Sequence, residues 1–117
     1  MTDLSAEDRK LVTLARATRA RTGAAEGAAV RDDHGRTYAA ATVDLPSLRV
    51  SALEVCVAMA VASGSRGLEA AVVLTADAGG LAGSGALADL GGPSVVVHVG
   101  DPTGRELRSG TAGEPPA

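Results

Sequence analysis

The chain has 117 residues, a length that suits one domain, and 45% of them are hydrophobic, which indicates a globular fold. Its net charge of -3 and its single aromatic residue, a tyrosine, disfavour nucleic-acid binding, because neither an attractive field nor a stacking platform is present. The single cysteine allows no internal disulfide, and the N-terminal sequence shows no signal-peptide pattern. The sequence also contains no apolar run long enough to cross a membrane. We therefore expect a cytoplasmic protein without membrane association.

The first predicted helix runs from Ser5 to about Thr22. The Ser5 hydroxyl can cap its N-terminus, and apolar residues follow at helical spacing. Three arginines near its end form a basic stripe, which we interpret as a solvated face favoured by the helix dipole rather than as a phosphate site. They are Arg16, Arg19 and Arg21.

A β-hairpin and a central helix are predicted next. Two apolar runs flank the turn-forming residues 32–35, and Leu45-Pro46 ends the second strand. Ser51 and Glu54 then form a capping-box pattern at the start of the second helix. Residues 55–62 are apolar on every side, which is typical of a buried helix.

The remaining residues predict two buried strands, at 70–74 and 94–100, separated by a short helix at about 84–90. A turn at 101–104 and an edge strand at 106–108 follow, so the predicted single domain covers 1–108 and a flexible tail covers 109–117. The order α-β-β-α-β-α-β predicts an α/β sandwich of two or three layers, with a mixed sheet of four or five strands.

This order and several local sequences resemble the cytidine deaminase family over about residues 22–101. The resemblance implies a three-layer sandwich built around the Ser51 helix, and a homo-oligomer, dimer or tetramer, assembled through the central helices. It is carried by Gly27-Ala28-Ala29, the turn Asp33 to Arg36, Thr42-Val43-Asp44, Val50-Ser51-Ala52-Leu53 and Ala60 to Gly64.

The same resemblance implies that the zinc chemistry of the family is missing. Zinc deaminases hold the metal through a Cys or His at the start of the central helix and through Cys-x-x-Cys, with a Glu that moves protons. Ser51 stands in the first ligand position, Leu53 in that of the Glu, and Leu81 and Ser84 in those of the two cysteines. We therefore expect no zinc, no other cofactor and no catalytic residue, as in a pseudoenzyme.

Nucleoside recognition is also reduced in this comparison. Ala24 falls where the family has a stacking Phe, whereas Thr42 and Asp44 keep polar side chains at positions that contact the ribose. Thr42, Asp44 and Glu54 are therefore candidate ligand-binding residues, with a nucleoside or a protein as the partner. Two alternatives stay open: a hydrolase that uses Asp44, Glu54 and serines, and an active cytidine deaminase.

Other reactive residue types receive structural interpretations. Cys56 is expected to be an inert core thiol, His98 a hydrogen-bonded strand residue and His34 an exposed turn residue. The sequence Gly83-Ser84-Gly85 begins a Gly-x-Gly-x-x-Ala pattern, but the long gap after the preceding strand disfavours a dinucleotide site. We expect these glycines to let the backbone enter the space of the missing metal.

Overall fold

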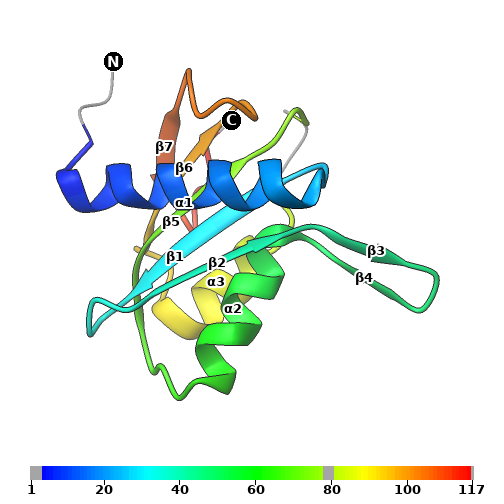
Figure 1. The fold of residues 1–117 in the computed structure, drawn as a ribbon. Helices are drawn as coiled ribbons and strands as arrows, with labels where there is room; N and C mark the ends of the chain where they lie inside the picture. The colour runs from blue at the N-terminus through cyan, green and yellow to red at the C-terminus, as the bar shows by residue number, and fades with distance from the viewer. Residues whose placement is uncertain (1–3, 78–80, 117) are drawn as a thin grey trace.

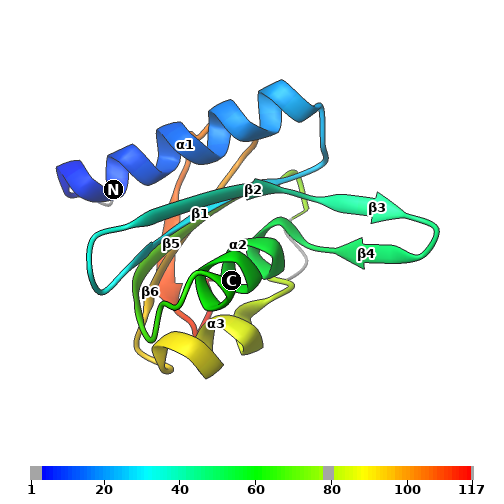
Figure 2. The ribbon, with the colours of Figure 1, turned by 60° about the horizontal axis from the view of Figure 1, so that its bottom comes forward.

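The structure, a computed structural model, describes residues 4–77 and 81–116. A five-stranded sheet forms the middle layer, helix α1 (Ala6–Thr22) covers one face, and helices α2 (Ala52–Ala62) and α3 (Ser84–Gly91) cover the other (Figures 1 and 2). This is the predicted three-layer α/β sandwich. Among the described residues, no helix combines the length and hydropathy needed to cross a membrane.

The sheet is mixed, with the strand order β2-β1-β5-β6-β7. Its strands are β1 (Gly27–Asp32), β2 (Thr37–Ala41), β5 (Leu68–Leu74), β6 (Val96–Gly100) and β7 (Arg108–Thr111). Only β5 and β6 are parallel, and α3 lies in the connection between them. The other neighbours pair antiparallel, beginning with the predicted β1–β2 hairpin.

Two apolar cores lie on the two faces of the sheet, because successive strand residues point to opposite sides. In β5, Val72 and Leu74 face α1, whereas Ala71 and Val73 face α2 and α3. The core residues are mostly Ala, Val and Leu. Small side chains allow close approach: a Cβ added to Gly27 would lie 2.2 Å from the carbonyl oxygen of Ala15 on α1.

A two-stranded extension follows β2 and consists of β3 (Val43–Leu45) and β4 (Leu48–Val50). A strand ends at Leu45, as predicted, but the strand after Pro46 was not predicted. Leu45 pairs with Leu48, so Pro46 and Ser47 form a tight turn. Proline fixes the φ angle that suits the first turn position, so it marks the reversal of the hairpin and not its end. Figures 1 and 2 show this hairpin, which we call the β3–β4 arm, projecting from the sandwich.

Two further predictions need correction. The edge strand lies at Arg108–Thr111 and not at 106–108, so the predicted tail begins inside a strand that pairs with β6. The helix predicted to be apolar and buried all round, α2, buries one face, which includes Leu53, Cys56 and Ala60. Its other face stays apolar, and the described part of the chain leaves it partly open; Val61 is 55% exposed.

Candidate functional site

Ser51 caps the N-terminus of α2, as predicted. Its Oγ accepts a hydrogen bond from the backbone N–H of Glu54 at 3.1 Å, and Glu54 Oε1 accepts one from the backbone N–H of Ser51 at 2.9 Å. This reciprocal pair satisfies two backbone donors that the helix leaves unpaired. The same Ser51 hydroxyl donates to the carbonyl oxygen of Ala82 at 3.0 Å. Both of its hydrogen-bonding roles are therefore filled from within the chain.

The segment before α3 lies directly against the start of α2. Gly83, at φ +105°, is so close that an added Cβ would stand 3.1 Å from Glu54 Cγ and 3.3 Å from both Glu54 N and Leu53 Cβ. Only glycine readily combines this backbone conformation with such a contact. Gly83 therefore lets the segment before α3 lie against the start of α2.

The two leucines at this place are apolar packing residues. Leu53 is fully buried in the core between the sheet and α2, and Leu81 is half-buried against the same core. Ser84 is the first residue of α3. Ser51, Leu53, Leu81 and Ser84 thus lie on the starts of α2 and α3 and on the segment that leads into α3.

A concavity of about 290 Å³ brings most of the predicted polar residues together. Its lining includes Thr42 before β3, Asp44 on β3, and Ser51 and Glu54 at the start of α2. Sequence reasoning did not name the other five lining residues as part of a site, because they carry no local signal. These are Glu26, which pairs with Thr42 across the sheet end, Val43, Arg49 and Val50 of the arm, and Ala82.

The polar groups of this concavity are largely engaged with each other. Thr42 Oγ1 accepts from the backbone N–H of Glu26 at 3.0 Å. Asp44 and Arg49 form an exposed ion pair of 3.4 Å across the β3–β4 arm, and such pairs contribute little to stability. Three carboxylates, those of Glu26, Asp44 and Glu54, line the space with one guanidinium. The site is therefore acidic, and the described residues that line it include no cysteine or histidine.

The other candidate metal ligands lie elsewhere. Cys56 is buried, and burial raises the pKa of its thiol to about 12, so it remains a protonated core residue as predicted. His98 is 4% exposed and hydrogen-bonded at both ring nitrogens on the opposite, α1 face of the sheet. His34 is exposed in the β1–β2 turn, also as predicted.

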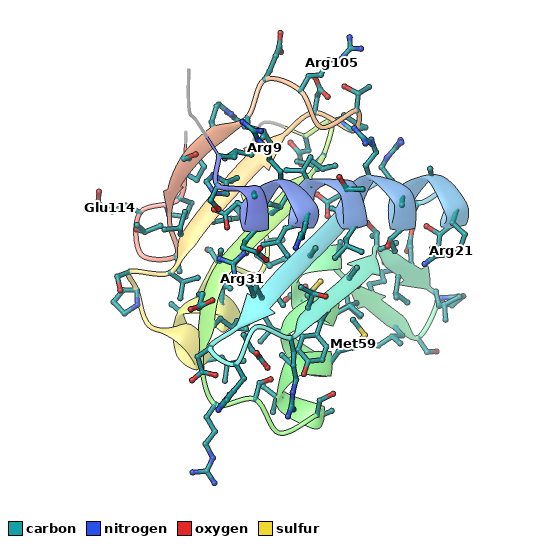
Figure 3. The ribbon with its side chains drawn as sticks, turned by 60° about the vertical axis from the view of Figure 1, so that its left-hand side comes forward. Arg9, Arg21, Arg31, Met59, Arg105 and Glu114 are labelled. Carbon is teal, nitrogen blue, oxygen red and sulfur yellow. The ribbon has the colours of Figure 1, made fainter. Side chains whose placement is uncertain are left out.

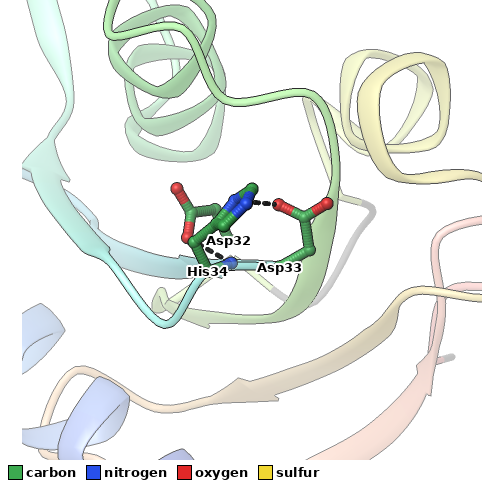
Figure 4. Close-up of side chains that lie close together, drawn as sticks. All are labelled: Asp32, Asp33 and His34. Carbon is green, nitrogen blue, oxygen red and sulfur yellow. Dashed lines mark hydrogen bonds and ion pairs between the residues drawn. The ribbon is translucent and has the colours of Figure 1, made fainter.

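Asp32, Asp33 and His34 form the group of possible ligands that sequence reasoning did not single out (Figure 4). Their ligand atoms lie within 4.8 Å of one another. However, Asp32 is fully buried, and its oxygens accept hydrogen bonds from the backbone of His34 and Arg36 and from Ser65. Burial alone would raise the pKa of this carboxyl, but these hydrogen bonds and the charge of Arg36 hold it below its usual value. These hydrogen bonds explain why the three residues lie together: Asp32 stabilises the β1–β2 turn.

Solved structures with the same fold include a cytidine deaminase from Burkholderia pseudomallei, with a TM-score of 0.78, 22% identity and 94% of each chain covered. A cytidine deaminase from Mycobacterium leprae has a TM-score of 0.68, with 22% identity over 94% of this chain and 95% of its own. A mutant cytidine deaminase from Mycobacterium tuberculosis has a TM-score of 0.70, with 21% identity over 95% of this chain and 93% of its own.

At this level of identity the three structures show the fold alone. A comparison with curated protein sequences found no significant match. The family model described as cytidine deaminase-like matches residues 4–104, which is most of the chain and includes every element from α1 to β6. The chain therefore belongs to the cytidine deaminase-like family.

Proposed function

We propose that the chain is a zinc-free member of this family that is catalytically inactive as a deaminase and has a binding or assembly role. The proposal rests on the side chains at the positions that match the zinc ligands of the family. A catalytic zinc needs three thiolate, imidazole or carboxylate ligands and a water. The positions that match those of the zinc ligands hold Ser51, Leu81 and Ser84, two neutral hydroxyls and an alkyl group. These residues do not fit a zinc ion, and Leu53 cannot carry a proton in place of the family's Glu.

The packing at the start of α2 supports this proposal. Ser51 Oγ already holds Glu54 N–H and the Ala82 carbonyl, and Gly83 lies against Leu53 and Glu54. Protein atoms therefore join the two helix starts that a metal ion joins in a zinc deaminase. Metal binding stabilises folded metalloproteins considerably, and the burial of Leu53 offers a replacement for that contribution.

Elemental analysis and a turnover assay test the proposal. The full chain is expressed with excess zinc, and metal content is measured alongside the absorbance change of cytidine. We expect far less than about one zinc per chain and no turnover above buffer. A variant with Ser51→Cys, Leu53→Glu, Leu81→Cys and Ser84→Cys is the matched control, because it supplies the missing ligands. About one zinc per unmodified chain, or measurable deamination, would contradict the proposal.

A second candidate is a hydrolase or deaminase that acts on a nucleoside through a non-standard site. The concavity lined by Asp44, Ser51 and Glu54 favours it. Its volume of about 290 Å³ is at the small end for a ligand pocket. Calorimetric titration with cytidine and chromatography of the reaction mixture distinguish the two functions: binding without product supports a binding role, and product that disappears in Asp44→Asn supports the enzyme.

For the assembly role, we propose that a second copy of this chain covers the exposed side of α2. A concave apolar surface of about 470 Å³ lies between α2 and the β3–β4 arm, and we call it the α2–arm surface. Leu48 on the arm is 53% exposed, although it is a large apolar side chain, and Met59 of α2, labelled in Figure 3, lies in the same surface. Its lining residues are Val43, Leu48, Val50, Val55, Ala58, Met59 and Ala62.

A projecting apolar arm beside an apolar hollow is a self-complementary shape, as a two-fold interface requires. Sedimentation velocity of the chain should therefore show a dimer or a larger closed assembly. Leu48→Asp and Met59→Asp should shift it to monomer, because each buries a charge in an apolar contact. Val96→Asp is the control, since Val96 is 38% exposed on the strand β6 and does not line this surface. A monomeric wild type would refute this assembly.

A further inference from the structure

Three polar residues from distant parts of the chain meet on the α1 face of the sheet. His98 Nδ1 lies 2.6 Å from Ser109 Oγ, and His98 Nε2 lies 2.8 Å from Asp8 Oδ2. His98 and Ser109 are direct cross-strand neighbours on β6 and β7, and Asp8 belongs to the first turn of α1. None of them lines the concavity at the start of α2.

The charges around Asp8 determine the direction of its hydrogen bond with His98. Burial alone would raise the pKa of Asp8, but the contacts with His98 and Arg31 lower it below its usual value. Arg31 Nη1 lies 3.0 Å from Oδ1, near enough for an ion pair although its N–H is not aligned on that oxygen. Arg31, labelled in Figure 3, is in turn held by Glu69 at 3.0 Å. The Asp8 carboxylate is therefore ionised and can only accept.

In the neutral form of His98 that the reaction below uses, the ring proton lies on Nε2, since the Asp8 carboxylate donates no hydrogen bond. The lone pair of Nδ1 then faces Ser109, and the Ser109 hydroxyl donates to it. A serine that donates to one imidazole nitrogen while a carboxylate holds the other is activated as a nucleophile on many folds. Here the two ring nitrogens are exchanged relative to the Ser-His-Asp triad, with the serine on Nδ1 and the carboxylate on Nε2.

Solvent access differs among the three residues in a way that suits this chemistry. Ser109 is exposed on β7, an edge strand, whereas His98 is 4% exposed. Helix α1 packs mainly over β1, β2 and β5, whereas β7 lies at the other edge of the sheet. Among the described residues, Ser109 is the only serine whose side chain contacts a histidine ring.

We propose that Ser109 is a nucleophile, activated by His98 and Asp8, that accepts acyl groups from small activated carboxylic esters. Ser109 Oγ forms a bond to the ester carbonyl carbon and gives its proton to His98 Nδ1. The bond from that carbon to the leaving oxygen breaks, and the leaving oxygen takes the proton from His98. Water then adds to the acyl-serine, loses a proton through the same nitrogen and releases the carboxylic acid and free Ser109.

A serine-directed fluorophosphonate tests the first bond formation directly, because Ser109 Oγ displaces fluoride from phosphorus. The full chain is incubated with the probe and mapped by peptide mass spectrometry, and p-nitrophenyl acetate hydrolysis is followed in parallel. We expect one label per chain, on Ser109. The rate should fall at least about 100-fold in Ser109→Ala and in His98→Gln, the usual effect of losing a general base.

Ser94→Ala is the matched control, since Ser94 is also exposed and contacts no histidine in the described part of the chain. Its rate should equal that of the wild type. An unlabelled wild type, or label spread evenly over exposed serines, would overturn the proposal. Neither result bears on zinc binding or on the α2–arm surface, so this inference and the proposed function can fail separately.

Ser109→Cys keeps the test decisive if His98→Gln does not fold. Its thiol should react with iodoacetamide well below the pH at which ordinary thiols react, because the imidazole accepts its proton. Cys56 is the internal control, because burial raises its pKa to about 12. An alkylation profile typical of an ordinary exposed thiol would refute the activation.

Discussion

Replacing Gly83 by alanine measures how firmly the segment before α3 is seated on α2. At φ +105° an L-residue loses about 1–2 kcal/mol relative to glycine. The new Cβ would also stand 3.1 Å from Glu54 Cγ and 3.3 Å from Leu53 Cβ, so the segment must move by a few tenths of an ångström. That movement weakens the bond from Ser51 to Ala82, worth about 1 kcal/mol. The expected loss in the free energy of unfolding is about 2–3 kcal/mol.

Alanine substitutions at two other glycines separate the conformational cost of Gly83→Ala from the cost of its contact with α2. Gly64 has φ +92° with nothing within 4 Å of an added Cβ, so Gly64→Ala should cost only the conformational part, about 1–2 kcal/mol. Gly85 lies inside α3 in open space, so Gly85→Ala should stabilise the chain by about 0.5 kcal/mol. Urea unfolding followed by far-ultraviolet circular dichroism gives all three values. If Gly83→Ala costs no more than Gly64→Ala, the contact between the two helix starts is not real.

Three further predictions concern buried and half-buried titratable groups. Asp32→Ala should lower the free energy of unfolding by about 3 kcal/mol and Asp32→Asn by less, because the alanine leaves two backbone donors and Ser65 without their acceptor; equal urea midpoints would speak against this. Asp8 and Asp32 have folded-state pKa values below the ordinary 3.8, so the stability they provide is complete above that pH and declines as pH falls further. An acid titration of the urea midpoint checks this sign, and a midpoint that rises on acidification would exclude it. Cys56 should resist iodoacetamide at pH 8 in the folded chain and react once denatured, as mass spectrometry would record; rapid labelling of the native chain would contradict its burial.

The parts of the fold that local patterns encode were predictable. The spacing of Ser51 and Glu54 predicted the capping box, and residues 32–35 predicted the β1–β2 turn. The β3–β4 arm was missed because Pro46 has two meanings: it excludes a residue from a sheet interior, but it also favours a turn between two strands. Only the pairing of Leu45 with Leu48 separates these meanings, and that pairing is not a local property.

The candidate sites also differ in whether their residues are close together in the sequence. Thr42, Asp44, Ser51 and Glu54 lie close together in the chain, and it was the resemblance to the family, not a local pattern, that singled them out. The structure places all four around one concavity. The contact of His98 with Asp8 joins residues 90 positions apart. Ser109 lay in a segment that was predicted to be a tail. Such contacts depend on which strands become neighbours, and a single strand pattern carries no information about its partner.

The β3–β4 arm gives the molecule two regions of unequal rigidity. Each of its strands has three residues, and one side of each strand has no neighbour in the sheet. A ribbon of this size gains little stability alone, so opening it requires far less free energy than opening the sandwich. Its leucines can therefore adjust to the shape of whatever they contact while the five-stranded sheet stays unchanged. Substitutions at the six strand residues and two turn residues of the arm can therefore change which partner it binds without disturbing the core.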